Sequence, residues 1–204
     1  MRFGTTLVPG LLLTFAAAWL GLVVGPYRQL GRLRPVPLAF GDSFPPTPGG
    51  LAELGRRVYI ANGCVDCHTQ QVRPPRSGSD LGRGWGPRRS VPRDYLYEQP
   101  PLLGHRRTGP DLLNVGSRRT DANWHHLHLY SPRAVPPGSI MPSFRFLYER
   151  REVLSQPSRQ AVRLPADWSV KPGYELVPTL EARALVAYLL SLDHTTPLPE
   201  AGTP

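Results

Sequence analysis

The chain has 204 residues, which is enough for one domain of ordinary size with accessory segments but not for two large domains. Hydrophobic residues make up 40%, charged residues 19%, and the formal net charge is +9, a composition that excludes a disordered, highly charged chain. With two cysteines, both a disulfide-stapled scaffold and a zinc module built on four cysteines are excluded. The 25 prolines and 20 glycines predict a loop-rich protein with short helices.

The first predicted element is an apolar helix at the N-terminus. No charged residue occurs from Phe3 to Tyr27, and about 20 apolar residues cross a bilayer as a helix. Pro9 lies in the first turns, where its missing N–H costs least. A cleaved signal peptide is the alternative, since Ala16–Ala18 offers small residues to a peptidase, but cleavage there would leave the apolar segment Trp19–Val24 as a new N-terminus. We predict a retained membrane anchor over residues 1–27.

Residues 28–50 are predicted to be a linker. Six prolines and four glycines lie between residues 26 and 50, and at that density we expect neither a helix nor a strand. The functional domain is therefore expected to cover residues 51–195, with a short tail over residues 196–204.

Two amphipathic helices are predicted inside this domain. The segment Leu51–Ile60 has an apolar stripe of Leu51, Leu54, Val58 and Tyr59. Near the other end, Thr179 is a helix cap for residues 180–192, in which apolar residues recur at helical spacing: Leu185, Tyr188, Leu189 and Leu192. Each helix needs a partner to bury its apolar face, and Gly55 permits a close crossing. This pair resembles the terminal helices of the class I cytochrome c fold.

Both cysteines lie in the motif Cys64-Val65-Asp66-Cys67-His68. The pattern C-x-x-C-H is the attachment signature of c-type haem: each thiol adds to one vinyl group of the porphyrin, and the adjacent His68 becomes the proximal iron ligand. Three other readings exist for such a pair. A thioredoxin-like site needs a βαβ setting, zinc needs two further ligands at metal spacing, and a disulfide across two intervening residues is strained. We predict one covalently bound haem c.

The sixth position of the iron decides between electron transfer and ligand chemistry. Met141, in Ile140-Met141-Pro142, is the only methionine besides the initiator, and its loop suits a weak sulfur ligand. A core methionine filling a gap is the alternative reading. His125, His126 and His128 compete as ligands, although we expect all three to form local hydrogen bonds. We expect His105 and His194 to be solvated surface histidines.

The run Arg107-Thr108-Gly109-Pro110-Asp111-Leu112 follows the cysteine motif. In class I cytochromes c, a similar Gly-Pro-Asn/Asp-Leu run places the proline carbonyl where it accepts the Nδ1–H of the proximal histidine. The resemblance implies that Pro110 does the same for His68, which fixes its tautomer and strengthens it as an iron donor. A plain Gly-Pro turn is the alternative.

Seven ordered segments make the resemblance more specific, because together they look like subunit II of the cbb3-type cytochrome c oxidases. They are Cys67-His68-Thr69-Gln70, Val72-Arg73-Pro74, Tyr97-Glu98-Gln99-Pro100, Arg106-Arg107-Thr108-Gly109-Pro110-Asp111-Leu112, Trp124-His125-His126-Leu127-His128-Leu129, Ser131-Pro132-Arg133 and Ser139-Ile140-Met141-Pro142-Ser143-Phe144. The similarity covers about residues 50–150 and the helix near 180–192. Two departures occur: Trp85 replaces a usual Tyr, and the Pro-rich residues 151–178 do not match.

The resemblance implies a mainly α, class I cytochrome c-like haem domain with long loop insertions behind one transmembrane helix. It implies Cys64 and Cys67 as thioether sites, and His68 and Met141 as axial ligands. The implied role is that of a non-catalytic electron-transfer subunit, which relays single electrons from an upstream cytochrome c to a haem–copper oxidase catalytic subunit. An independent anchored shuttle cytochrome and a peroxidase-like enzyme are the alternatives.

The family implies that the haem domain lies outside the cytoplasmic membrane, on the periplasmic side. Charge predicts the opposite, since Arg28, Arg32 and Arg34 follow the helix and Arg2 precedes it. We give the haem chemistry precedence over the charge count.

Residues 69–107 form an insertion with eight arginines, which is either a solvated basic loop or a surface for a partner subunit, haem propionates or anionic lipid. Nucleic-acid binding is not expected, since no basic module interleaved with aromatic residues is present.

Overall fold

The computed structural model describes residues 3–47 and 49–202. The chain forms two compact units: one consists of Met1–Pro45 with Pro92–Leu96, and the other of Pro46–Val91 with Tyr97–Pro204. Secondary structure in the described residues is mainly helical, with two small two-stranded sheets. The predicted mainly α fold behind one apolar N-terminal helix is therefore confirmed.

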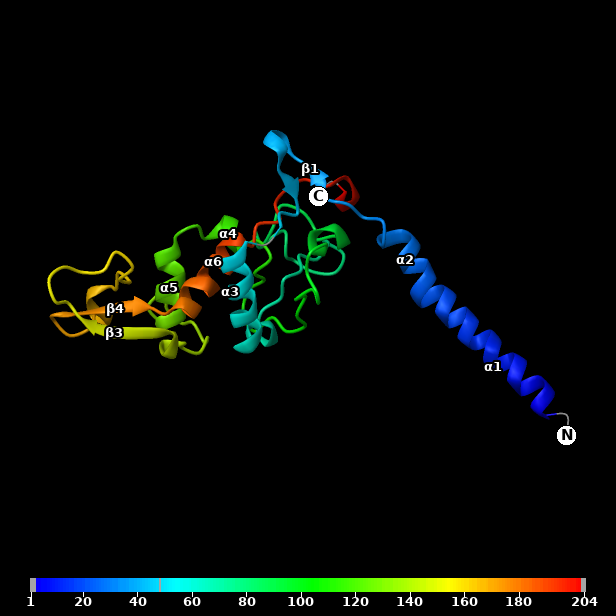
Figure 1. Cartoon of the computed structure of the whole chain (residues 1–204), viewed down its shortest axis with the longest axis horizontal. Helices are drawn as coiled ribbons and strands as arrows, with labels where there is room; N and C mark the ends of the chain where they lie inside the picture. The colour runs from blue at the N-terminus through cyan, green and yellow to red at the C-terminus, as the bar shows by residue number, and fades with distance from the viewer. Residues whose placement is uncertain (1–2, 48, 203–204) are drawn as a thin grey trace. The chain divides into compact units, whose positions relative to one another are not determined.

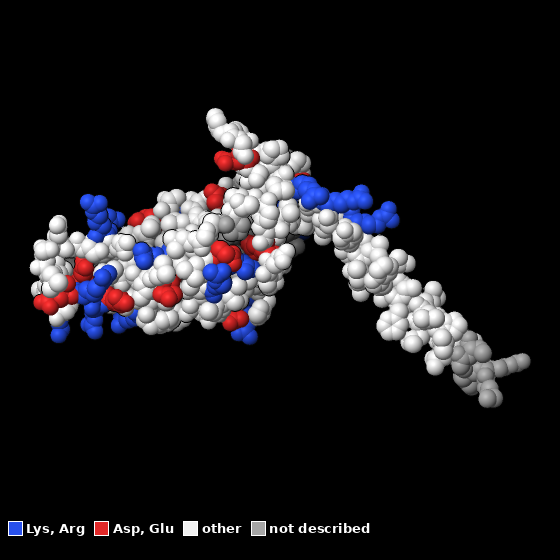
Figure 2. Space-filling view, viewed as in Figure 1, with Lys and Arg blue, Asp and Glu red and all other residues white. Residues whose placement is uncertain are grey.

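The first unit begins with a long helix made of three consecutive segments. Helix α1 (Phe3–Trp19) continues through a π-helical turn, η1 (Leu20–Val24), into α2 (Gly25–Leu30). The stretch Thr6–Leu30 has a mean hydropathy of 2.2, and within the described ranges it is the one helix long and apolar enough to cross a membrane. Its surface carries no charged side chains until basic ones gather at its end (Figure 2). This helix fits the predicted membrane anchor.

The expectation that residues 26–50 hold neither helix nor strand is wrong. The helix passes through Pro26, and strands β1 (Val36–Pro37) and β2 (Ser43–Phe44) pair in a short antiparallel hairpin. Pro26 directly follows the π-helical turn, and such a turn accommodates a residue that cannot complete the regular backbone hydrogen-bond ladder. The density of prolines therefore predicts less regular secondary structure in residues 26–50 than the chain forms.

In the second unit, α3 (Gly50–Ala61) packs against α6 (Leu180–Ser191) (Figure 1). A Cβ on Gly55 would lie 1.9 Å from the carbonyl oxygen of Ala184, so the two backbones touch at this glycine. The rings of Tyr59 and Tyr188 meet edge to face with 5.5 Å between their centroids. Both predicted helices and their close crossing at Gly55 are confirmed.

The ends and faces of these helices follow the predicted patterns with one exception. The Thr179 hydroxyl accepts a hydrogen bond from Ala182 N at 3.3 Å and caps α6 as predicted. The predicted apolar positions Leu185, Tyr188, Leu189 and Leu192 are buried, as are Val58 and Tyr59 of α3, whereas Leu51 is 46% exposed. Short helices α4 (Val115–Arg118) and α5 (Ala122–Tyr130) also pack on α6.

Residues 148–178 form a hairpin beyond α5 (Figure 1). Strand β3 (Tyr148–Glu152) pairs antiparallel with β4 (Tyr174–Pro178), and the register runs from Tyr148 opposite Pro178 to Glu152 opposite Tyr174. The connecting loop folds back, since Val162 N donates to Leu176 O at 2.8 Å. The Pro-rich segment is therefore an ordered part of the second unit.

The remaining described elements are single helical turns: η2 (Ala39–Gly41), η3 (Cys64–Asp66), η4 (Pro92–Tyr95), η5 (Arg145–Leu147), η6 (Ala166–Trp168) and η7 (Pro199–Ala201). Of these, η3 contains the cysteine motif and lies directly after α3, which fixes the motif to the helix crossing.

Candidate functional site

The cysteine motif forms one tight turn after α3. Gly63 takes a left-handed conformation with φ 66°, and the chain then turns so that Cys67 N and His68 N both donate to Cys64 O, at 3.2 and 3.0 Å. Both thiols are free: Cys67 is exposed, and Cys64 is half-buried against the main apolar core. Burial raises the pKa of the Cys64 thiol to about 12. Two thiols and an imidazole are thus presented from a single turn.

His68 is held by a contact with the Gly-Pro run. Its Nδ1 lies 2.8 Å from the carbonyl oxygen of Pro110, which can only accept a hydrogen bond, so Nδ1 carries the proton and Nε2 is left as the donor toward a metal. Burial lowers the pKa of His68, and its hydrogen bond to Pro110 opposes that shift. The imidazole is therefore oriented and tautomerically fixed in the way that the sequence motif predicts.

Gly109 lies directly beneath this imidazole. A Cβ at this position would lie 2.2 Å from Cε1 and 2.7 Å from Nδ1 of His68, so a larger residue cannot occupy the site without moving the ring. The backbone on both sides is tied to the cysteine turn: Gly109 N donates to Cys67 O at 3.0 Å, and Leu112 N donates to Thr69 O at 2.8 Å. The two segments 67–69 and 109–112 form one rigid cradle.

Met141 lies in the loop before β3. It is half-buried and packs against the same apolar cluster as Cys64, and its backbone N–H donates to Ser139 Oγ at 3.3 Å. Its neighbour Ile140 is 74% exposed. The structure thus places the candidate sulfur ligand and the cysteine turn on one core.

Of the three clustered histidines of α5, His125 and His128 form local hydrogen bonds as predicted, whereas His126 bonds a residue 22 positions along the chain. His125 Nε2 pairs with Arg119 O at 2.7 Å, His126 Nδ1 pairs with the Tyr148 hydroxyl at 3.1 Å, and His128 Nδ1 pairs with Val135 O. Burial lowers the pKa of all three, to about 4 for His126, so they are neutral at pH 7.

The two isolated histidines differ from each other. His105 is exposed as predicted. The prediction for His194 is wrong, because this residue is 8% exposed and its backbone N–H donates to Asn114 Oδ1 at 2.9 Å. The chain turns inward after α6, which sequence spacing does not reveal.

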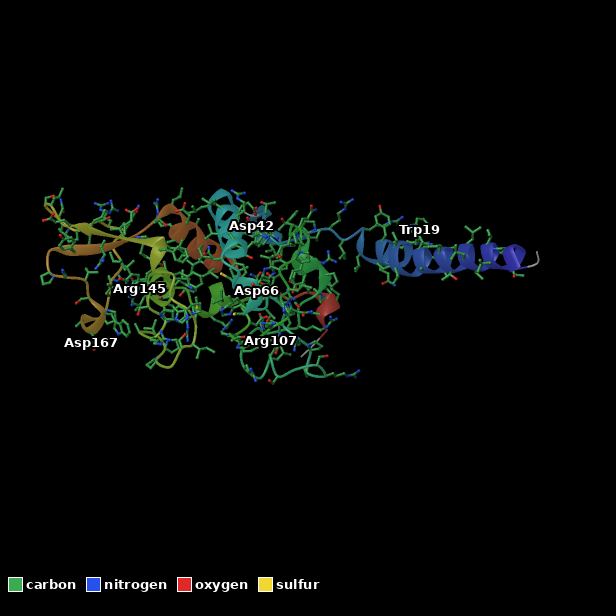
Figure 3. All side chains as sticks on the ribbon, turned by 90° about the horizontal axis from the view of Figure 1, so that it is seen from below. Trp19, Asp42, Asp66, Arg107, Arg145 and Asp167 are labelled. Carbon is green, nitrogen blue, oxygen red and sulfur yellow. The ribbon has the colours of Figure 1, made fainter. Side chains whose placement is uncertain are left out.

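The arginines of the insertion have internal roles that the sequence analysis did not foresee. Arg88 is 7% exposed, and its Nε donates to Thr196 O at 2.7 Å. Arg107, which is labelled in Figure 3, forms an ion pair with the buried Asp80. Of the two alternatives for the insertion, a solvated basic loop therefore does not describe Arg88 and Arg107, while Arg76, Arg83 and Arg106 are exposed.

Asp111, which the sequence analysis treats only as part of a motif, is a buried residue at the centre of the cradle. Its side chain is fully buried and accepts hydrogen bonds from Thr69 Oγ1 at 2.6 Å, Gln71 N at 2.7 Å and Leu113 N at 2.9 Å. The sequence did offer one signal, since Asp111 lies between Pro110 and the apolar residues Leu112 and Leu113. An acidic side chain buried among apolar residues needs hydrogen-bond partners, so its role in the cradle could have been suspected.

The side chains present fit an iron porphyrin held by thioether bonds. Two thiols lie on one turn, the next residue is an imidazole with Nε2 directed away from its anchored Nδ1, and Gly109 leaves room only for that ring. Among the described residues no three His, Cys, Asp or Glu side chains form a metal cluster, so zinc finds no further ligands beside the cysteines.

Comparison with known proteins agrees with this geometry. A family model described as "Cytochrome C oxidase, mono-heme subunit/FixO" matches residues 45–176, which is more than half of the chain. The match includes nearly all of residues 151–178, so the expectation that this segment lies outside the resemblance is wrong. No curated protein matches the chain. Since the family match spans the cysteine turn, the Gly-Pro cradle and the Met141 loop, this chain belongs to the family of mono-haem subunits of cytochrome c oxidase.

Proposed function

We propose that the chain holds one haem c and relays single electrons from an upstream cytochrome c to the catalytic subunit of a haem–copper oxidase. Cys64 and Cys67 supply the thioether sulfurs, and His68 and Met141 supply the axial ligands. The observation that carries the proposal is the contact between His68 Nδ1 and Pro110 O, because it presents Nε2 beside two thiols on one turn.

A haem held from both faces supplies a reversible one-electron couple without an open coordination site. The residues make and break no bond during turnover. His68 donates from Nε2 while Pro110 O polarises its ring, Gly109 keeps the ring in place, and the apolar core around Cys64 and Met141 excludes water. A fixed donor set of this kind needs little rearrangement when the charge changes.

A peroxidase-like function is less well supported. That chemistry needs an open iron position and a catalytic group beside it. His125, His126 and His128, the histidines near the candidate ligand loop in sequence, each use a ring nitrogen in a local hydrogen bond.

The anchor and its orientation are part of the proposal. The Thr6–Leu30 helix fits a single membrane pass in contact with lipid, and we place the haem domain on the periplasmic side. Haem c is attached outside the cytoplasm, which outweighs the opposing charge of Arg28, Arg32 and Arg34. Protease accessibility of the domain in intact spheroplasts tests this orientation, because a cytoplasmic domain would stay protected.

The first test is the Met141→Ala variant of the full-length protein in detergent. Loss of the methionine sulfur should open the sixth position of the iron, lower the reduction potential and allow carbon monoxide to bind. The wild-type spectrum, in contrast, should be low-spin and unaffected by carbon monoxide. Ile140→Ala, at the exposed neighbouring position, is the control and should behave as wild type. An unchanged Met141→Ala spectrum would refute the ligand assignment.

Covalent attachment and assembly need separate measurements. Pigment that resists extraction by acid acetone supports thioether bonds, and a colourless or extractable product refutes them. Co-purification in mild detergent with a multi-helix haem–copper subunit distinguishes a resident subunit from an independent shuttle cytochrome.

A further inference from the structure

The insertion buries an acidic side chain that the proposed ligand set does not use. Asp80 is 2% exposed, and its Oδ2 accepts a hydrogen bond from Arg73 N at 2.7 Å. Its Oδ1 accepts from Nη1 of Arg107. Burial acts to raise the pKa of Asp80, but these hydrogen bonds outweigh burial and hold its pKa below the usual range. Asp80 is therefore a buried carboxylate anion, and Arg107 is its counterion.

Arg107 uses its remaining donors on the segment that follows the proximal histidine. Its Nε donates to Thr69 Oγ1 at 3.0 Å, and its Nη2 donates to Gln71 O at 2.6 Å. The guanidinium also lies over the ring of Trp85, 5.2 Å from its centroid. A planar fork with several fixed donors is what distinguishes Arg from Lys, so this site uses the geometry of Arg as well as its charge.

Thr69 connects Arg107 to the Gly-Pro cradle through hydrogen bonds of its hydroxyl. It is the residue next to His68, and its hydroxyl donates to Asp111 Oδ2 at 2.6 Å. Asp111 is the residue next to Pro110, and its Oδ2 also lies 3.8 Å from Nη2 of Arg107. The hydrogen bond between His68 and Pro110 is thus flanked by Thr69 on one segment and by Asp111 on the other, and both belong to one hydrogen-bond network.

We propose that Thr69, Asp80, Arg107 and Asp111 form a proximal clamp, a set of positioning residues that fixes His68 against Pro110 and sets the reduction potential of the bound haem. This inference rests on the proposed function and deepens it. It also assigns a role to the insertion of residues 69–107, because the insertion supplies Thr69, Asp80 and Arg107 to the clamp.

The charges of the clamp give the proposal a sign. Two buried carboxylates, Asp80 and Asp111, both form ion pairs with Arg107, while Arg73 also acts electrostatically on Asp80 and Arg118 on Asp111. Charges in a buried, low-dielectric site act more strongly than surface charges on a nearby redox centre. Loss of Arg107 leaves excess negative charge, which favours the oxidised, more positive iron and lowers the potential. Loss of the Asp80 charge has the opposite effect.

The experiment measures the midpoint potential of full-length pigmented protein by equilibrium redox titration, together with thermal unfolding. Arg107→Gln should lower the redox equilibrium constant about tenfold, which is about 59 mV for one electron. Asp80→Asn should raise the potential. The double variant Asp80→Asn/Arg107→Gln keeps the net charge and should return close to the wild-type potential, although both single variants unfold at lower temperature.

Matched controls separate the clamp from a general charge effect. Arg106→Gln removes the exposed neighbouring arginine, and Glu149→Gln removes an exposed carboxylate on β3. Both controls should change the midpoint potential, relative to wild type, by only a small fraction of the change that Arg107→Gln produces. If Arg107→Gln and Arg106→Gln shift the potential equally, or if Asp80→Asn and Arg107→Gln shift it in the same direction, the clamp proposal is overturned.

A further variant covers the case in which Arg107→Gln yields no folded, pigmented protein. Arg107→Lys keeps the charge but loses the fork, so the contact between His68 and Pro110 should weaken and His68 should become a weaker donor to the oxidised iron. The potential of this variant should therefore rise above that of wild type and of Arg106→Lys; equality with both overturns the proposal. A wild-type protein that lacks covalent, low-spin haem refutes the proposed function itself. A low-spin wild type with an unresponsive Arg107 refutes the clamp alone.

Discussion

Gly109 illustrates how a single side chain limits the proximal ligand. The His68 ring and the Gly109 backbone are in direct contact, and the same loop supplies the carbonyl that orients the ring. In the sequence this glycine is part of a common Gly-Pro turn, whereas in the structure it packs against the imidazole ring of His68. The conformational freedom of glycine matters less here than its lack of a side chain.

The Gly109→Ala variant should disturb the proximal ligand. Its Cβ would lie 2.2 Å from His68 Cε1, so either the ring or the loop must move, and the 2.8 Å contact with Pro110 cannot survive unchanged. We expect a lower yield of pigmented protein and an altered low-spin spectrum in what remains, measured as the ratio of Soret to protein absorbance. Thr108→Ala, at the exposed adjacent position, is the control; a normal spectrum for Gly109→Ala would contradict the prediction.

At the scale of elements, the crossing of α3 and α6 holds the site in place. Helix α3 leads directly into the cysteine turn, and α6 closes the apolar core on which Cys64 and Met141 pack. The approach of the two backbones at Gly55 brings Tyr59 onto Tyr188, whose hydroxyl lies 3.0 Å from Nε2 of the buried Gln70. The crossing therefore positions the chain both before and after the motif.

The Gly55→Ala variant tests this crossing. In an exposed helix, alanine in place of glycine stabilises by about 1 kcal/mol. Here the new Cβ would lie 1.9 Å from Ala184 O and 2.7 Å from Tyr188 Cβ, so we expect destabilisation of about 2 kcal/mol, as for an overpacked core. Denaturant unfolding measures the change. Gly50→Ala, where nothing lies within 4 Å of the new Cβ, should be neutral or stabilising, and similar behaviour of the two variants would argue against a tight crossing.

At the scale of the whole molecule, Arg88 and Arg89 of the insertion hold the C-terminal tail within the second unit. Arg88 donates to Thr196 O, and Arg89 donates to the carbonyls of Glu200 and Ala201. Leu198 is 4% exposed. The β3–β4 hairpin of the second unit carries many charged side chains (Figure 2). The anchor helix of the first unit shows none until the basic side chains at its C-terminal end (Figure 2).

Ending the chain after Thr195 should therefore destabilise the second unit. The truncation removes the carbonyl that Arg88 bonds and the buried Leu198, and together these losses should cost about 3 kcal/mol. Thermal unfolding of the pigmented protein measures the effect. Combined with Arg88→Ala, the two changes should be less than additive, because they remove the same contact. A truncated protein as stable as the full chain would show that the tail contributes nothing.

Local patterns were sufficient for much of this molecule. The apolar N-terminal helix, the amphipathic helices around Gly55 and Thr179, and the cysteine turn could all be predicted, because helical periodicity, capping and haem-attachment spacing depend on residues close together in the chain. The local hydrogen bonds of His125 and His128 could be predicted for the same reason, whereas the bond of His126 to Tyr148 depends on the fold. The roles of Cys64, Cys67, Pro110 and Met141 as haem contacts stay predictions.

Tertiary structure decided the features that depend on residues far apart in the sequence. The burial of His194, the internal use of Arg88 and the pairing of β3 with β4 each require the whole second unit to be folded. Asp80 and Arg107 are 27 residues apart, and no short-range rule pairs them. A buried charge takes whichever partner the fold brings within reach, so the proximal clamp emerges only when the inserted loop closes beside His68.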